Sequence, residues 1–185
     1  MDSLVIPTLE TERLRLRPLR ASDFEDYAAL RADPEVMRHL VGPWDRGRAW
    51  RHLAFLLGHW HLGKPGMWAM ERKGDGAFLG LVGYAEPEGW PGFELGGVLA
   101  RRFWGRGYAA EGARAALDYA FTLLKKERVI SLVHPENHAS IRVVERLGER
   151  LQARIEHQGR EMLCYGIDRE SWEASASREP LLAAS

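Results

Sequence analysis

A short segment rich in glycine and arginine carries the clearest chemical signal in this sequence. It covers residues 101–111 and reads RRFWGRGYAAE. Gly105 and Gly107 allow the backbone to turn tightly and to bring several N–H groups close to a ligand. The helix expected to follow adds unpaired N–H groups and the positive end of its dipole, while Arg102 and Arg106 add positive charge. Together these features predict a binding site for a phosphate or pyrophosphate group.

Two other interpretations of this segment stay open. A tight strand-to-helix turn with solvated arginines needs no ligand. Residues 105–110 also satisfy the loose dinucleotide pattern G-x-G-x-x-A, which would indicate a nucleotide-binding regulator. Three residues separate the preceding strand from Gly105, however, and Pro135 and Glu136 follow the next buried strand too late for the usual ribose-binding acid. Because the sequence also contains no G-x-x-x-x-G-K-[ST] loop, dinucleotide and nucleotide binding are the weaker alternatives.

Three ordered blocks of the sequence resemble the GNAT superfamily of N-acetyltransferases. Arg102-x-x-Gly105-x-Gly107, continued by Ala109, is similar to the acyl-CoA pyrophosphate loop of that family, Q/R-x-x-G-x-G/A. TERLRLRPLRASDFEDY near the start resembles the opening strand and helix of the ribosomal-protein N-terminal acetyltransferase (RimJ/RimL-type) branch. HPENHASIRVVERLG resembles the N-x-x-S-x-x-[VL]-x-E-x-x-G segment of the same branch. The resemblance extends over about residues 10–172.

The resemblance implies both a fold and a reaction. The fold is α+β, with a GNAT-like mixed, mostly antiparallel central sheet and helices on both faces. Two parallel strands, 93–99 and 129–134, splay apart at the cofactor site, and the pantetheine arm lies in the gap. The reaction is transfer of an acetyl group from acetyl-CoA to a primary amine, on a protein N-terminus or a small molecule, by direct attack in a ternary complex. A non-catalytic acyl-CoA-binding sensor or regulatory module is the alternative function.

Cofactor-binding positions follow from the matched motifs. The pair Gly96-Gly97 permits a β-bulge that would free main-chain N–H groups near Val98 or Leu99 to bond the pantetheine and to polarise the thioester carbonyl. Asn137 and Ser140 match the N-x-x-S positions that contact the CoA arm and the departing sulfur, although both residue types also suit a helix start. The full predicted set is Val98, Leu99, Arg102, Trp104, Gly105, Arg106, Gly107, Tyr108, Ala109, Asn137 and Ser140.

The predicted catalytic residues are Glu94, Ser140 and Tyr165. Glu94 is the candidate to accept a proton from the attacking ammonium, directly or through water; its alternative is a surface carboxylate on a strand. Tyr165 is a candidate acid for the thiolate, although an aromatic residue in a terminal strand more often serves packing. The sequence departs from the family at Ala110, where threonine is usual, and at Glu149, where an aromatic is usual. The second change is expected to alter the packing of the splayed region.

The remaining sequence predicts the elements that position these residues. Alternating apolar residues and turn signals indicate strands, of which the three from 67 to 100 are antiparallel neighbours. Spacing of i, i+3 and i+4 indicates helices, with a strand–helix–strand crossover around residues 94–134. Strands are expected at 12–19, 67–73, 77–86, 93–100, 129–135, 150–157 and 161–168. Helices are expected at 22–32, after Pro34, at 47–62, at 109–124 and from Asn137 to Gly148.

Composition limits the class of protein. The 185 residues contain 26 Lys+Arg and 26 Asp+Glu, so zero net charge argues against a nucleic-acid partner. The lone Cys164 excludes an intramolecular disulfide and favours a cytoplasmic protein, and no segment resembles a signal peptide or a membrane span. Residues 1–172 are predicted to form a single acyl-CoA N-acyltransferase domain and residues 173–185 a flexible C-terminal tail. No metal is expected, because His59 and His61 would point to different faces of a helix. The oligomeric state, including a homodimer, stays open.

Overall fold

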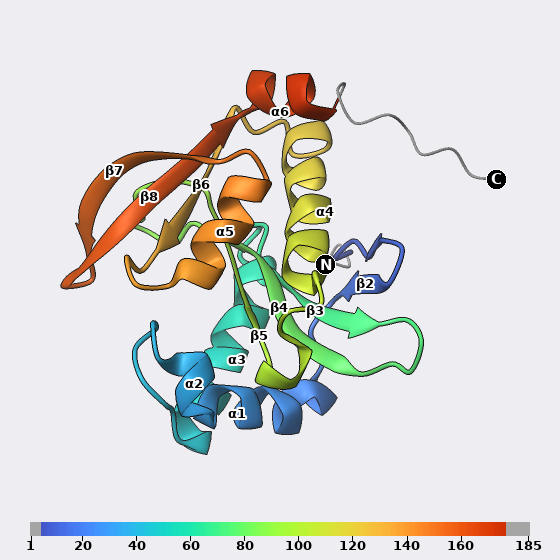
Figure 1. Cartoon of the computed structure of the whole chain (residues 1–185). Coiled ribbons are helices and arrows are strands. Elements are labelled where there is room, and N and C mark those ends of the chain that lie inside the picture. The colour runs from blue at the N-terminus through green and yellow to red at the C-terminus, as the bar shows by residue number, and fades with distance from the viewer. Residues whose placement is uncertain (1–4, 177–185) are drawn as a thin grey trace.

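The computed structural model describes residues 5–176, which form an eight-stranded sheet with helices on both faces (Figure 1). The strands are β1 (Leu9–Glu10), β2 (Leu14–Arg17), β3 (Met67–Arg72), β4 (Phe78–Ala85), β5 (Glu94–Leu99), β6 (Arg128–Val133), β7 (Arg150–His157) and β8 (Arg160–Asp168). Their order in the sheet is β1-β2-β3-β4-β5-β6-β8-β7. Neighbouring strands are antiparallel except for β5 and β6, which are parallel. The predicted α+β class with a mixed, mostly antiparallel sheet is therefore confirmed.

The helices begin at residues that can satisfy their first N–H groups. Asp33, Asp45 and Asn137 each accept backbone N–H bonds at the start of a helix. The helices are α1 (Phe24–Ala32), α2 (Pro34–Met37), α3 (Arg46–His61), α4 (Tyr108–Thr122), α5 (His138–Arg146) and α6 (Arg169–Ala176), with 3₁₀ turns η1 (Ala21–Asp23) and η2 (Arg101–Phe103). Within residues 5–176, no helix has the length and apolar character needed to cross a membrane.

Apolar side chains pack on both faces of the sheet. Helix α4 carries the predicted stripe of buried residues, in which Ala116 and Ala120 are small enough to bring the helix close to the strands. Leu117 is fully buried in this cluster, which stabilises the fold by about 1.5–3 kcal/mol for such a side chain. A second cluster joins α1, α2 and α3 to the sheet through Leu81 and neighbouring residues. The crossover helix α4, which connects β5 to β6 along the chain, is thus packed against a face of the sheet.

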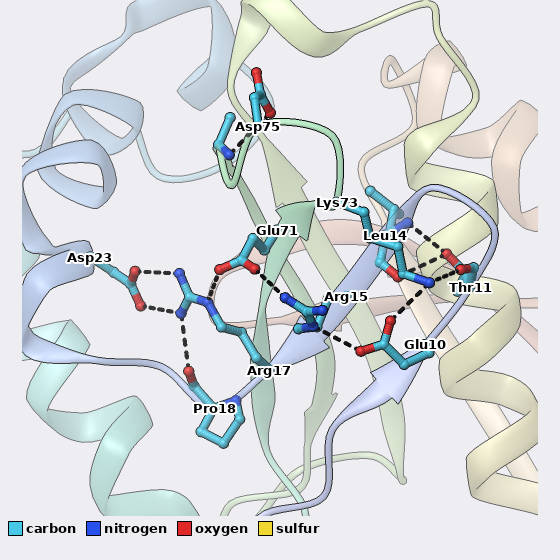
Figure 2. Close-up of polar contacts among 11 residues, drawn as sticks. Glu10, Thr11, Leu14, Arg15, Arg17, Pro18, Asp23, Glu71, Lys73 and Asp75 are labelled. Carbon is cyan, nitrogen blue, oxygen red and sulfur yellow. Dashed lines mark hydrogen bonds and ion pairs between the residues drawn. The ribbon is translucent and has the colours of Figure 1, made fainter.

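A buried ion-pair network fastens the start of the chain to the sheet. Arg17 is 5% exposed and donates hydrogen bonds from both terminal nitrogens to Asp23, at 2.9 and 2.8 Å, and from Nε to Glu71 at 2.5 Å. Figure 2 shows the guanidinium of Arg17 between these two carboxylates, with Arg15 on the other side of Glu71. Since a buried charge is costly without its partner, this network fixes the position of η1 and α1 beside β3.

Two details differ from the sequence predictions. The β4–β5 register is uninterrupted from Leu99 to Glu94, so the bulge predicted at Gly96-Gly97 is absent. An irregularity lies instead between β3 and β4, where Met70 and Glu71 are opposite Gly80 and Phe78. In addition, α6 continues through residues 173–176, whereas the sequence predicts a flexible tail from residue 173. The rest of that predicted tail lies outside the described residues.

Candidate active site

Strands β5 and β6 separate soon after they meet. Their parallel pairing consists of Glu94 opposite Ile130, together with a 3.0 Å hydrogen bond from the Ile130 N–H to the Phe93 carbonyl. Beyond that point β5 stays paired with β4, and β6 stays paired with β8. The two halves of the sheet are turned away from each other in Figure 1. The predicted splay of these strands is therefore present, and we call the point where it begins the root of the splay.

Backbone direction decides which groups of β5 can bind a ligand in the splay. The Ala100 N–H donates to the Leu79 carbonyl in β4 at 2.8 Å. Because N–H directions alternate along a strand, the N–H groups of Gly97 and Leu99 point toward the gap, whereas that of Val98 points toward β4. The expectation for Leu99 fits this geometry. The main-chain role predicted for Val98 does not, because the missing bulge leaves its N–H directed at the neighbouring strand.

The glycine-rich loop forms a concave row of backbone N–H groups. Gly105 and Gly107 have φ angles of 71° and 81°, in the left-handed region that favours glycine, and Gly107 caps α4. The first helical hydrogen bond runs from the Glu111 N–H to the Gly107 carbonyl at 3.1 Å. The N–H groups of residues 108–110, which precede this bond in the first turn of α4, have no acceptor within the helix. An anion is the natural partner for such a row at a helix N-terminus.

The arginines of the loop differ in their surroundings. Arg101 lies 3.3 Å from Asp33, and Arg102 lies 3.4 Å from Asp26. The exposed side chain of Arg106 has no ion pair among residues 5–176. Arg106 is therefore the predicted residue whose charge is available to a phosphate without breaking an existing contact.

Sequence reasoning missed the contact that holds the loop in shape. Arg13 donates to the Arg106 carbonyl at 2.9 Å and to Glu111 Oε2 at 2.7 Å, and its guanidinium lies 4.5 Å from the centre of the Tyr108 ring. Thr11 donates to the other oxygen of Glu111 at 2.6 Å. The N-terminal segment thus braces both the loop and the first turn of α4. Trp104, at the other end of the loop, is tied back by a 2.9 Å bond from its indole N–H to the Leu99 carbonyl.

Glu94 lies at the root of the splay, and the pKa of its carboxyl is unusually high. Burial raises the pKa of this carboxyl to about 7, although a 2.6 Å hydrogen bond from the Trp90 indole N–H favours the charged form. A carboxyl with a pKa near neutrality is suited to accept a proton from a substrate and release it again. The alternative of an ordinary surface carboxylate does not fit this environment.

The other two catalytic candidates have different settings. Ser140 lies in the first turn of α5, where its N–H donates to Asn137 Oδ1 at 3.1 Å, so the capping role of Asn137 is present. Tyr165 is 4% exposed and packs with Val133 and neighbouring apolar residues. Its hydroxyl donates to Glu145 at 3.3 Å, and burial raises the pKa of the phenol. Tyr165 thus packs as one interpretation expects, and its role as an acid stays a prediction.

Ser131 and Glu149 are two further polar residues at the root of the splay, and the sequence predicts no catalytic or binding role for either of them. Glu149 is 2% exposed and lies 3.0 Å from the hydroxyl of Ser131. Burial, together with the nearby charge of Glu94, raises the pKa of Glu149 to about 7. The sequence marked this position only as a replaced aromatic, because nothing local shows that the side chain turns inward.

One group of side chains has the types and spacing of metal ligands. Atoms of His39, His134 and Glu136 lie within 4.8 Å of one another. However, the Nδ1 atom of His134 accepts a hydrogen bond from the Glu136 N–H at 3.2 Å, which engages the single lone pair of that nitrogen and leaves Nε2 as the atom of this ring that could bind a metal. His59 and His61, considered from the sequence, are not in this group.

Comparison with known proteins identifies the architecture. The model of the GNAT acetyltransferase domain matches residues 13–150. The chain belongs to this family. It is 36% identical over 143 residues to the Bacillus subtilis (strain 168) protein YkkB, covering 76% of this chain and 83% of YkkB. The crystal structure of an acetyltransferase from Agrobacterium tumefaciens str. C58 has a TM-score of 0.81 and 36% identity, covering 89% of this chain and 96% of that one.

A more distant relative carries a more specific name. Spermidine N(1)-acetyltransferase of Escherichia coli (strain K12) is 26% identical over 148 residues, covering 78% of this chain and 77% of the relative. Membership of the GNAT family confirms the predicted fold and the class of enzyme, an acetyltransferase that uses acetyl-CoA.

Proposed function

We propose that this protein moves an acetyl group from acetyl-CoA to a primary amine by direct attack in a ternary complex. The observation that carries the proposal is Glu94, a carboxyl at the root of the splay whose pKa is raised to about 7 by burial. At neutral pH a large share of this group is ionised and able to take a proton from an ammonium. Its place at the edge of the gap in which the pantetheine arm is expected to lie supports the proposal.

Each proton in the reaction has a candidate partner. Glu94 removes one proton from the ammonium, and the free amine attacks the thioester carbonyl to form the C–N bond. The Leu99 N–H, which points into the gap, stabilises the negative charge that develops on the carbonyl oxygen. When the C–S bond breaks, the thiolate takes up the second proton that the attacking nitrogen loses, and the hydroxyl of Ser140 is the candidate hydrogen-bond donor to the departing sulfur.

The glycine-rich loop is the proposed binding site of the CoA pyrophosphate. Its row of N–H groups at residues 108–110 and the exposed charge of Arg106 offer hydrogen bonds and electrostatic attraction to the same group. Ser140 and Asn137 flank the start of α5, from which they contact the rest of the arm. The brace from Arg13 keeps the loop in its binding conformation before the cofactor arrives.

The acceptor belongs to one of two classes of primary amine. Resemblance to the ribosomal-protein N-terminal acetyltransferase branch favours a protein N-terminus. The relationship to spermidine N(1)-acetyltransferase favours a small amine. This branch assignment, the cytoplasmic location and a homodimer all stay predictions.

Thiol release from acetyl-CoA in the presence of N-terminal peptides and polyamines tests the activity, with mass spectrometry of the product. Glu94→Gln should lower kcat by about 100-fold or more, since loss of a general base typically costs that much, while CoA binding persists. Glu156→Gln, at an exposed position on β7, is the matched control and should keep its activity. Full activity of Glu94→Gln would contradict the assigned role.

The sensor alternative gives a different result in the same assays. A non-catalytic module would bind CoA and yet release no thiol with any acceptor in a broad panel. Turnover that depends on Glu94 excludes it. A preference for NAD over CoA in a titration would instead revive the nucleotide-binding interpretation of the loop.

A further inference from the structure

A serine and a buried carboxyl bridge the two strands at the root of the splay. Leu95 and Ser131 are the first residues beyond the pair formed by Glu94 and Ile130. The Ser131 hydroxyl oxygen lies 3.1 Å from the Leu95 carbonyl oxygen and 3.0 Å from Glu149 Oε1. The other oxygen, Glu149 Oε2, is buried without a hydrogen-bond partner among residues 5–176. A chain of three polar groups therefore connects β6 to β5 where backbone pairing stops.

The hydrogen-bonded link through Leu95, Ser131 and Glu149 has two protonation states. A serine hydroxyl has one hydrogen to donate, and a backbone carbonyl can only accept. Both contacts of Ser131 are hydrogen bonds only when Glu149 is protonated and donates to the serine oxygen, so that the serine donates to Leu95. When Glu149 is ionised, it draws the serine hydrogen to itself, and the Leu95 carbonyl loses its partner. The link between the strands thus depends on one proton.

The surroundings favour retention of that proton near neutral pH. The titratable and charged groups around Glu149 are Glu94 on β5, Arg128 on β6, Cys164 and Tyr165 on β8, Glu145 on α5 and Arg150 at the start of β7. Burial raises the pKa of Glu149 to about 7, and the like charge of Glu94 acts in the same direction. Ionisation of Glu94 therefore makes loss of the Glu149 proton harder.

We propose that Glu149 and Ser131 form a proton-dependent clasp that holds β5 to β6 at the root of the splay and thereby sets the width of the slot for CoA. Glu149 is a positioning residue in this scheme, and it acts through Ser131. A cavity of about 370 Å³, bordered by Glu149 and Glu145, gives its proton a place to exchange with water. The proposal rests on the proposed function in one respect, that CoA occupies the splay.

The affinity for CoA, measured by calorimetry between pH 6 and pH 9, tests the clasp without requiring turnover. In the wild-type protein the affinity should fall about three- to tenfold as Glu149 ionises, which corresponds to the loss of one hydrogen bond. Glu149→Gln should remove this additional fall, because an amide donates to Ser131 at every pH. Ser131→Ala should bind with the weaker, alkaline affinity throughout. Glu156→Gln is the control. Its CoA affinity should change with pH as that of the wild type does, because both proteins combine the ionisation of CoA itself with that of Glu149.

A second measurement reports on Glu149 in the free protein. In ¹³C-glutamate-labelled protein, the carboxyl carbon that disappears in Glu149→Gln should titrate near pH 7, and Glu94→Gln should lower its pKa by removing the like charge. A carboxyl that titrates near pH 4.5, or a Glu149→Gln variant that keeps the wild-type pH dependence of CoA affinity, would overturn the clasp. Failure of every acceptor to react would instead count against the proposed function and would leave these two measurements valid.

Discussion

Replacement of Glu149 by glutamine should stabilise the protein at alkaline pH and have much less effect at pH 5. Burial raises the pKa of Glu149 from 4.5 to about 7, with a smaller effect of the Glu94 charge in the same direction. The folded protein therefore binds this proton more tightly than the unfolded chain does. The free energy of unfolding must fall as pH rises from about 4.5 to about 7, and the stability lost there is not regained at higher pH.

The size of the effect follows from the same pKa difference. At about 1.36 kcal/mol for each pKa unit, ionisation of this buried carboxyl costs about 3 kcal/mol. Most of that cost lies above pH 5, so the stability of Glu149→Gln relative to the wild type should grow by about 2–3 kcal/mol between pH 5 and pH 8. A glutamine of nearly the same shape keeps the packing and donates to Ser131, so no compensating loss is expected.

Urea unfolding followed by tryptophan fluorescence measures this difference at each pH. Glu156→Gln serves as the control, because that exposed carboxyl should give the same stability difference at pH 5 and pH 8. If the difference between Glu149→Gln and the wild type does not change with pH, the raised pKa of Glu149 is wrong. The proton-dependent clasp then loses its basis as well.

Four other variants test the glycine-rich loop, its brace and the buried network around Arg17. Gly107→Ala should weaken CoA binding, measured by calorimetry, about tenfold more than Gly105→Ala does. A Cβ added at position 107 would lie 3.3 Å from the Arg13 guanidinium, whereas one added at position 105 would meet nothing within 4 Å. Equal losses of affinity would contradict the role of Arg13 as the brace of the loop. Glu111→Gln weakens the hold on Arg13 and should lower CoA affinity about threefold, whereas unchanged affinity would mean that the loop holds its shape alone. Asp23→Ala leaves the buried guanidinium of Arg17 without one of its two carboxylate partners. The free energy of unfolding, measured in urea at neutral pH, should fall by about 3 kcal/mol, and a loss below about 1 kcal/mol would argue against burial of the Arg17–Asp23 pair.

Local sequence patterns were sufficient for most of the secondary structure. The stripe of Ala116, Leu117 and Ala120 predicts a helix that buries one face, and this helix is α4. Gly105 and Gly107 predict a tight turn, and both adopt the left-handed conformation. These features succeed because they depend on residues three or four positions apart or on the conformational freedom of a single residue.

Contacts between distant segments were not predictable in this way. Arg13 and Glu111 are 98 residues apart, and their approach depends on the docking of the N-terminal segment against α4. The predicted bulge at Gly96-Gly97 failed for a related reason, because the register of a strand is set by its partner. Here β4 pairs with β5 without a break, and this pairing selects Leu99 and not Val98 as the N–H donor toward the gap.

The sequence by itself determined the class of this protein: a neutral α+β chain whose glycine–arginine loop precedes a helix, with the ordered motifs of the GNAT family. The tertiary structure decided the chemistry at the root of the splay. A carboxyl has the same intrinsic acidity wherever it occurs in a sequence, and only its burial and its neighbours change that acidity. Glu94 on β5 and Glu149, between α5 and β7, are far apart in the sequence, and the fold leaves Glu94 half-buried and Glu149 buried where two strands part. Their shared position, and not their residue type, makes them candidates for proton chemistry near neutral pH.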